Sequence, residues 1–259
     1  RPEKDMQFTT RGGTGVQVSR LCFGTMSFGG DADENTSAAL FARCRDAGIN
    51  FFDCANVYSN GRAEQILGRL IAGSRRELVI TSKVWGPMGD DPNSRGLTRR
   101  NILRHVEDSL QRLGTDRLDV YFCHHVDPAT PMDETLRALD DLVRQGKVVY
   151  AGVSNWSAWR TARALGRAER LGLEPIRVLQ PMYNLAKRTA EVEILPLARA
   201  AGLAVVPYSP LGGGLLTGKY TRGNAAATGR LKTTPMYQKR YGQDEHFAIA
   251  ERFAAYAEQ

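Results

Sequence analysis

Short apolar segments recur along the chain, and each is rich in the β-branched and aromatic residues that favour strands. Their starts lie roughly 27 to 40 residues apart, which is the spacing of repeated strand–helix units. Most of them are continuous apolar runs rather than alternating ones, as expected of strands that helices cover. The segments are residues 20–24, 49–53, 78–84, 118–124, 148–154, 176–180 and 203–209.

The stretches between these segments have the apolar spacing of amphipathic helices. Helices are predicted within 36–48, 135–147 and 194–202, and glycines at positions 48, 146 and 202 mark where they stop. A further helical pattern follows residue 61, and Arg-rich residues 160–172 and the C-terminal residues 244–259 are also helix-like.

Seven strand–helix repeats over residues 1–259 predict a single (β/α)8 barrel domain of the α/β class. The alternative, an open dinucleotide-binding sheet, lacks its GxGxxG fingerprint between the first strand and the first helix. The sequence GGTGV at 12–16 precedes the first strand, which is the wrong context. Residues 6–20 are predicted to form a hairpin that closes the bottom of the barrel.

The eighth repeat is missing from this pattern. After segment 203–209 come a Gly-rich turn, a polar loop at 221–243 and the helix-like residues 244–259, with no eighth apolar strand. A barrel without one strand would have two unpaired edges. We therefore expect that a C-terminal part of the barrel, including its eighth unit, lies beyond residue 259.

Composition agrees with an ordinary globular protein, at 42% hydrophobic and 24% charged residues. No apolar run is long enough to span a bilayer, and the first residues lack a signal-peptide core, so we expect a cytoplasmic protein with no membrane partner. The four cysteines are far apart and are predicted to be reduced, mostly buried thiols rather than a metal site. The net charge of +7 favours an anionic ligand, and solvated helix faces explain it equally well.

In a barrel of this kind the active site lies at the carboxyl ends of the strands. Polar residues stand at several predicted strand ends, and each alone has an ordinary explanation as a solvated or structural residue. They are Asp53, Tyr58, Lys83, His124, Ser154, Asn155, Gln180, Tyr208 and Ser209.

Together, the first four of these residues have a more specific interpretation. A buried Lys83 needs a counter-charge, and Asp53 on the neighbouring strand supplies one. A lysine ammonium beside Tyr58 is predicted to lower the pKa of the phenol from about 10. Tyr58 then acts as a general acid on a carbonyl oxygen, to which His124 donates a hydrogen bond.

Distinctive motifs occur along essentially the whole chain. They are GTMSFGG (24–30), FFDCANVYSNGRAE (51–64), ITSKV (80–84), DVYFCHHVDP (119–128), GKVVYAGVSNW (146–156), QPMYNL (180–185) and PYSPLGGGLLTGKY (207–220). With these motifs the chain resembles the aldo-keto reductase superfamily. The resemblance implies that Asp53, Tyr58, Lys83 and His124 form the catalytic tetrad. Cys54 stands where relatives commonly have threonine.

The resemblance also implies a nicotinamide cofactor, NADPH in preference to NADH, bound across the barrel mouth without a Rossmann fold. Ser154, Asn155 and Gln180 would hold its carboxamide, and Tyr208 would stack on the nicotinamide ring. The turn after segment 203–209 would approach the pyrophosphate. The full implied cofactor set is Gly24, Thr25, Met26, Asp53, Ser154, Asn155, Gln180, Tyr208, Ser209, Leu211, Gly213, Gly214, Lys219 and Arg230.

The function implied is reduction of a small aldehyde or ketone, with Tyr58, His124 and Trp85 at the substrate. A core tryptophan explains Trp85 almost as well. The basic and aromatic residues 231–241 suggest nucleic-acid contact when taken alone, but after the seventh strand of a barrel they are better explained as a lid, so no nucleic acid is expected. Two other functions stay open: a nucleotide-sensing regulatory subunit of the same family, and a barrel isomerase that uses Lys83 and Asp53. Substrate identity and oligomeric state are not predicted.

Overall fold

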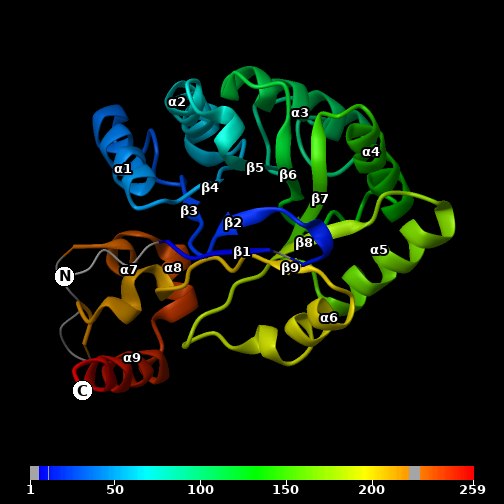
Figure 1. Cartoon of the computed structure of the whole chain (residues 1–259). Coiled ribbons are helices and arrows are strands. Elements are labelled where there is room, and N and C mark those ends of the chain that lie inside the picture. The colour runs from blue at the N-terminus through cyan, green and yellow to red at the C-terminus, as the bar shows by residue number, and fades with distance from the viewer. Residues whose placement is uncertain (1–5, 11, 222–227) are drawn as a thin grey trace. The chain divides into compact units, whose positions relative to one another are not determined.

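Seven parallel strands form one sheet, in which each strand neighbours the next one along the chain. The computed structural model describes residues 6–10, 12–221 and 228–259. Figure 1 shows the strands following one another in chain order. They are β3 (Phe23–Gly24), β4 (Phe51–Asp53), β5 (Val79–Val84), β6 (Leu118–Cys123), β7 (Val148–Ser154), β8 (Ile176–Gln180) and β9 (Ala204–Val205). This order confirms the predicted barrel-type α/β fold, and in the described part of the chain no eighth strand follows β9.

A two-stranded antiparallel hairpin precedes the sheet, as predicted. Strand β1 (Phe8–Thr10) pairs with β2 (Gln17–Ser19), and the short 3-10 helix η1 (Gly12–Thr14) lies between them. Tyr150 at the start of β7 donates a hydrogen bond of 2.8 Å to the carbonyl oxygen of Thr14. The hairpin is therefore tied to the amino-terminal ends of the sheet strands.

Helices connect consecutive strands of the sheet. They are α1 (Glu34–Asp46), α2 (Arg62–Ile71), α3 (Arg99–Leu113), α4 (Met132–Arg144), α5 (Ala158–Leu171) and α6 (Ile194–Ala200), with 3-10 helices η2 (Tyr58–Gly61), η3 (Arg75–Glu77) and η4 (Thr189–Glu191). Glycines 48, 146 and 202, predicted as helix stops, all have left-handed backbone conformations. Such a conformation is the usual end of a helix and favours glycine because it has no Cβ.

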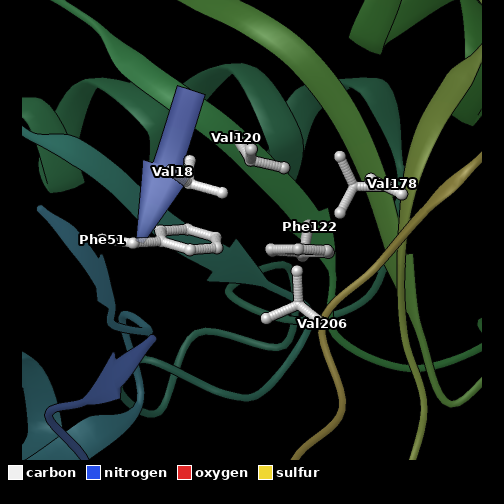
Figure 2. Close-up of a cluster of buried hydrophobic side chains, with 7 residues drawn as sticks. Val18, Phe51, Val120, Phe122, Val178 and Val206 are labelled. Atoms are coloured by element: carbon white, nitrogen blue, oxygen red, sulfur yellow. The ribbon is translucent and has the colours of Figure 1, made fainter. Parts of the chain in front are cut away.

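The core inside the curled sheet is built from alternate strands. Phe51 on β4, Val120 and Phe122 on β6 and Val178 on β8 are buried together with Val18 of the hairpin. Figure 2 shows these side chains pointing toward one another, with Val206 just after β9 beside them. Layers contributed by alternate strands are typical of barrel interiors. The hairpin therefore closes the core at the amino-terminal ends of the strands.

The chain divides into two compact units. One comprises Arg1–Leu179 with Leu197–Val206, and the other comprises Gln180–Pro196 with Pro207–Gln259. The first unit holds both sheets, and the prediction of one domain over residues 1–259 stays a prediction.

The second unit has a small core of its own. The 3-10 helix η5 (Gly212–Thr217) is followed by α7 (Arg230–Thr233), α8 (Pro235–Tyr241) and α9 (Asp244–Ala257), which are drawn in orange to red in Figure 1. Its buried side chains are Leu215, Leu216, Tyr220, Leu231, Tyr237, Tyr241 and Ala250.

The prediction of a polar loop over 221–243 is wrong for its second half, where α7 and α8 lie. Pro235 occupies the first position of α8, where a missing N–H costs no hydrogen bond. Tyr237 and Tyr241, four residues apart, bury one face of that helix. Residues 222–227 lie outside the described part. None of the helices in the described ranges has the length and apolar character needed to cross a membrane.

Removing the hairpin's contribution to the core is expected to destabilise the first unit. Val18→Ala deletes two buried methyl groups from a side chain that is 3% exposed, so it should lower the free energy of unfolding by about 2 kcal/mol. Val149→Ala is the matched control, because that strand valine is 37% exposed and should cost well under half as much. Urea denaturation followed by circular dichroism measures both. Equal losses would contradict the role of the hairpin as part of the core.

Candidate active site

Lys83 on β5 is completely buried, and all three of its N–H donors face oxygen atoms. Its Nζ lies 2.5 Å from Asp53 Oδ2, 2.6 Å from the carbonyl oxygen of Cys54 and 3.3 Å from the phenol oxygen of Tyr58. Burial is the largest single influence and lowers the pKa of the Lys83 ammonium, but Asp53, Tyr58 and Cys54 together outweigh it and the pKa is raised. Lys83 is therefore a cation at any physiological pH.

The pairing of β4 with β5 explains why these groups meet. Asp53, the last residue of β4, is in register with Thr81 of β5. Because side chains two apart on a strand share a face, Thr81 and Lys83 point to the same side. Thr81 donates a 2.7 Å hydrogen bond to Asp53 Oδ1, while Lys83 takes Oδ2. The sequence analysis did not predict the contact of Thr81 with Asp53. The two-residue repeat of side chains along the strand, counted back from Lys83, would have indicated it.

Tyr58 opens the 3-10 turn η2, and its ionisation differs from the prediction. Burial, the largest influence, raises the pKa of Tyr58, whereas the charge of Lys83 lowers it, and the net direction is upward. The prediction that the pKa of Tyr58 is lowered is therefore wrong: the ammonium does lower it as expected, but loss of water around the half-buried phenol raises it by more. Tyr58 keeps its proton at neutral pH.

His124 follows β6 directly and lies beside Tyr58. The two ring centroids are 6.1 Å apart in an edge-on arrangement, and the backbone N–H of His124 donates to the carbonyl oxygen of Val84. Burial, with smaller contributions from Lys83 and His125, lowers the pKa of His124 to about 3. His124 is therefore a neutral imidazole at working pH. The structure thus brings the four predicted tetrad residues together within the first unit.

A row of rings extends from His124 toward Trp85. His125 stacks on His124 at 5.1 Å between centroids, and Trp85 lies 4.7 Å from His125. The Trp85 indole N–H donates a hydrogen bond to the carbonyl oxygen of Val126. This bond holds the ring in place and uses its single donor. Contact of Trp85 with substrate stays a prediction. Sequence reasoning gave His125 no role, because one of two adjacent histidines carries no positional signal by itself.

Six of the predicted cofactor residues lie in the first unit, and their environments differ. Thr25 is buried, and its hydroxyl donates to the backbone carbonyl of Asp53, whereas Met26 is 40% exposed. Asn155 has a left-handed backbone at φ 60°. Its side-chain N–H group donates to Ser154 Oγ at 3.0 Å and to the carbonyl oxygen of His124 at 2.8 Å. Ser154 and Asn155 are therefore joined to each other and to the tetrad. Gly24 is in register with Asp53 in the sheet.

The remaining predicted cofactor residues belong to the second unit. Tyr208 and Ser209 begin a tight turn, in which Ser209, Gly213 and Gly214 all have positive φ. Lys219 lies over the ring of Tyr220 at 5.1 Å, and Arg230 lies over Tyr237 at 5.8 Å. Gln180 is buried, and Leu211 is half exposed. Apart from Gln180 and Arg230, the predicted cofactor residues of this unit all lie within residues 208–219.

Asn184, which was quoted within a motif but given no role, holds this turn. Its side-chain N–H group donates to the carbonyl oxygen of Ser209 and to the hydroxyl of Tyr241, at 2.9 and 3.0 Å. Its side-chain oxygen accepts from the backbone N–H groups of Ala186 and Lys187. A buried amide with every group satisfied is a rigid support.

The first unit also contains a cavity and four cysteines. A cavity of about 50 Å³ lies beneath the hairpin, lined by apolar residues that include Val16, Val18 and Phe51, at the end of the strands opposite the tetrad. All four cysteines are free thiols, and burial raises the pKa of Cys54 and Cys123 to about 12. No group of histidine, cysteine, aspartate and glutamate that could hold a metal occurs among the residues whose placement is described.

Comparison with known sequences matches the chain to a protein family and to several relatives. A sequence model of the "Aldo/keto reductase family" matches residues 20–258. The chain is 44% identical over 254 residues to "Uncharacterized oxidoreductase YrpG" of Bacillus subtilis, covering 94% of this chain and 78% of that protein. It is 43% identical to a "Probable voltage-gated potassium channel subunit beta" of Oryza sativa and 42% identical to one of Arabidopsis thaliana, each over 232 residues, 87% of this chain and 70% of the relative.

The neutral state of His124 predicts a pH dependence of stability. The folded state keeps the imidazole unprotonated down to about pH 3, whereas the unfolded chain takes up a proton near pH 6.5. Acidification through this window therefore favours unfolding, by up to about 1.4 kcal/mol per pH unit from this residue. His124→Phe should flatten the fall in the free energy of unfolding between about pH 6 and pH 4, measured by urea denaturation. Parallel curves for the two proteins would contradict the assignment.

Proposed function

Since the chain belongs to the aldo/keto reductase family, we propose that it reduces an aldehyde or a ketone to the alcohol with NADPH, Tyr58 serving as the general acid. The observation that carries this proposal is the direction of the hydrogen bond between Lys83 and Tyr58. An ammonium has three donors and no acceptor. The Tyr58 oxygen must therefore accept from Lys83, and the phenol's own O–H points to another acceptor.

A substrate carbonyl oxygen is the acceptor that fits this arrangement. Tyr58 holds its proton at neutral pH, as a general acid must before the reaction. As the phenol gives up its proton, the negative charge that develops on its oxygen meets the Lys83 ammonium at 3.3 Å. Stabilisation that appears only as charge develops lowers the barrier rather than the ground state. Neutral His124 supplies an N–H donor to the same carbonyl oxygen.

The chemistry of the donor set fits a nicotinamide dinucleotide. In the first unit, Ser154 and Asn155 offer hydroxyl and amide groups of the kind that hold a carboxamide. In the second unit, Gln180 offers a further amide and Tyr208 offers a ring for stacking. Gly213 and Gly214 belong to a tight turn beside the cation Lys219, an arrangement that would suit a phosphate group. The bound reduced cofactor would supply the hydride. The preference for NADPH is supported by the family resemblance and by the net charge of +7.

A second candidate function comes from the relatives named as channel subunits. In that case the chain would bind the nucleotide and regulate a partner with little turnover. The tetrad geometry favours the enzyme, because a binding module has no need of a proton donor backed by a buried ammonium. The two functions differ in one measurable property, turnover with bound nucleotide.

Loss of the phenol oxygen is expected to abolish most of the activity. Tyr58→Phe should lower kcat for aldehyde reduction by about 10² to 10⁴-fold, because it removes the proton donor while the ring stays in place. The measurement is loss of NADPH absorbance with a panel of aliphatic and aromatic aldehydes. Tyr256→Phe is the matched control, since that tyrosine is 75% exposed on α9 and should retain full activity.

The outcomes of this experiment separate the two functions. Normal turnover by Tyr58→Phe would contradict the proposed mechanism. If neither protein turns over while NADPH fluorescence still reports binding, the regulatory function is supported instead.

A further inference from the structure

The outer face of β5, behind Lys83, carries a buried polar network. Ser82 donates a hydrogen bond of 2.5 Å to Glu64 Oε1 on α2, and Arg112 Nε on α3 donates to Glu64 Oε2 at 2.7 Å. Glu64 is completely buried, and the Arg112 side chain is 18% exposed. A carboxylate this far from water needs such a partner, so Glu64 and Arg112 depend on each other. Ser82 is the immediate neighbour of Lys83 along the strand.

The same network touches the turn that carries Tyr58. Gly61, the last residue of that turn, has φ +88°, and a Cβ added to it would lie 2.9 Å from Arg112 Cδ. The aliphatic part of Arg112 thus packs directly on the end of η2. Through Arg112 and Ser82, Glu64 connects the turn of Tyr58 with the strand of Lys83.

The turn itself needs outside support. Ser59 and Asn60 have φ of 48° and 52°, and with Gly61 they make three consecutive left-handed residues. Such conformations are unfavourable for residues with a Cβ and persist only where surrounding contacts hold them. Ser59 is held on one side by its hydrogen bond to the carbonyl oxygen of Phe28, 2.8 Å long. Arg112 holds the other end.

We propose that Glu64 and Arg112 are positioning residues, which hold the Tyr58 turn against β5 so that the Tyr58 phenol stays at hydrogen-bonding distance from Lys83. Their catalytic consequence rests on the proposed function, but their effect on the position of Tyr58 does not. Neither residue contacts the tetrad oxygen atoms directly. They act through the backbone of the turn and of the strand.

A purely structural ion pair is the competing explanation, and the chain offers a matched control for it. Arg75 and Asp119 form another largely buried pair at 2.9 Å, with side chains 12% and 21% exposed. Asp119 lies at the start of β6, at the opposite end of the strands from the tetrad. Asp119→Asn therefore disturbs a comparable pair without touching the Tyr58 turn.

The position of Tyr58 can be measured without turnover. The protein has nine tyrosines, so labelling them with ¹³C at Cζ gives a small set of resonances, and Tyr58→Phe identifies the one from Tyr58. In Glu64→Gln the Tyr58 resonance should shift and its alkaline titration should change, while in Asp119→Asn both stay as in the wild type. Gly61→Ala crowds Arg112 Cδ and strains the left-handed end of the turn without removing a charge, so it should also shift the Tyr58 resonance.

Turnover provides the second measurement on the same variants. With saturating NADPH, Glu64→Gln and Gly61→Ala should lower kcat about tenfold and raise the solvent isotope effect, because a misplaced phenol slows proton transfer. The dissociation constant for NADPH should stay the same in these variants. A general loss of structure would raise it. Asp119→Asn should retain kcat.

Each result has one meaning. An unchanged Tyr58 resonance in folded Glu64→Gln and Gly61→Ala overturns the proposal, as does an equal change in Asp119→Asn. Full kcat in both variants alongside an active wild type also overturns it. If the wild type reduces none of the aldehydes while the Tyr58 resonance responds as expected, the positioning role stands and the proposed function fails.

Discussion

The buried charge of Lys83 is the constraint on which the rest of the site depends. An ammonium with no exposed surface must have its donors satisfied, and Asp53, the carbonyl of Cys54 and Tyr58 satisfy them. Because two of these partners come from the end of β4, the charge locks β4 to β5 at their carboxyl ends. The same charge fixes which way the Tyr58 hydrogen bond runs. Stability of the sheet and chemistry of the site are therefore set by one group.

Two opposing influences act on Tyr58, and their balance suits a proton donor. Burial raises the pKa of the phenol and Lys83 lowers it, with burial the stronger. A phenol already ionised at neutral pH would have no proton to give. A phenol with no cation beside it would leave the developing phenolate unstabilised in a dry site. The arrangement keeps the proton on Tyr58 at rest and supports its departure during the reaction that we propose.

The sequence predicted much of this fold because the controlling signals are local. Apolar runs marked all seven strands, glycines marked helix ends, and strand-end polar residues led to Asp53, Lys83 and His124. The sign of the Tyr58 pKa was not predictable, since it depends on how completely the folded chain excludes water from the ring. Helices α7 and α8 were missed because their few apolar residues lie among charges, and only packing against η5 and α9 reveals their buried faces.

Of the four tetrad residues, Tyr58 alone lies on an irregular turn. Asp53 and Lys83 belong to paired strands, and His124 follows β6 with its N–H bonded to Val84. Strand pairing fixes the backbone of these three by regular hydrogen bonds, whereas η2 contains consecutive left-handed residues. A general acid must be placed to within a fraction of an ångström, so the least regular segment requires the most support. This difference explains why the buried, charged network of Glu64 and Arg112 lies behind Tyr58, the one tetrad residue that regular structure does not position.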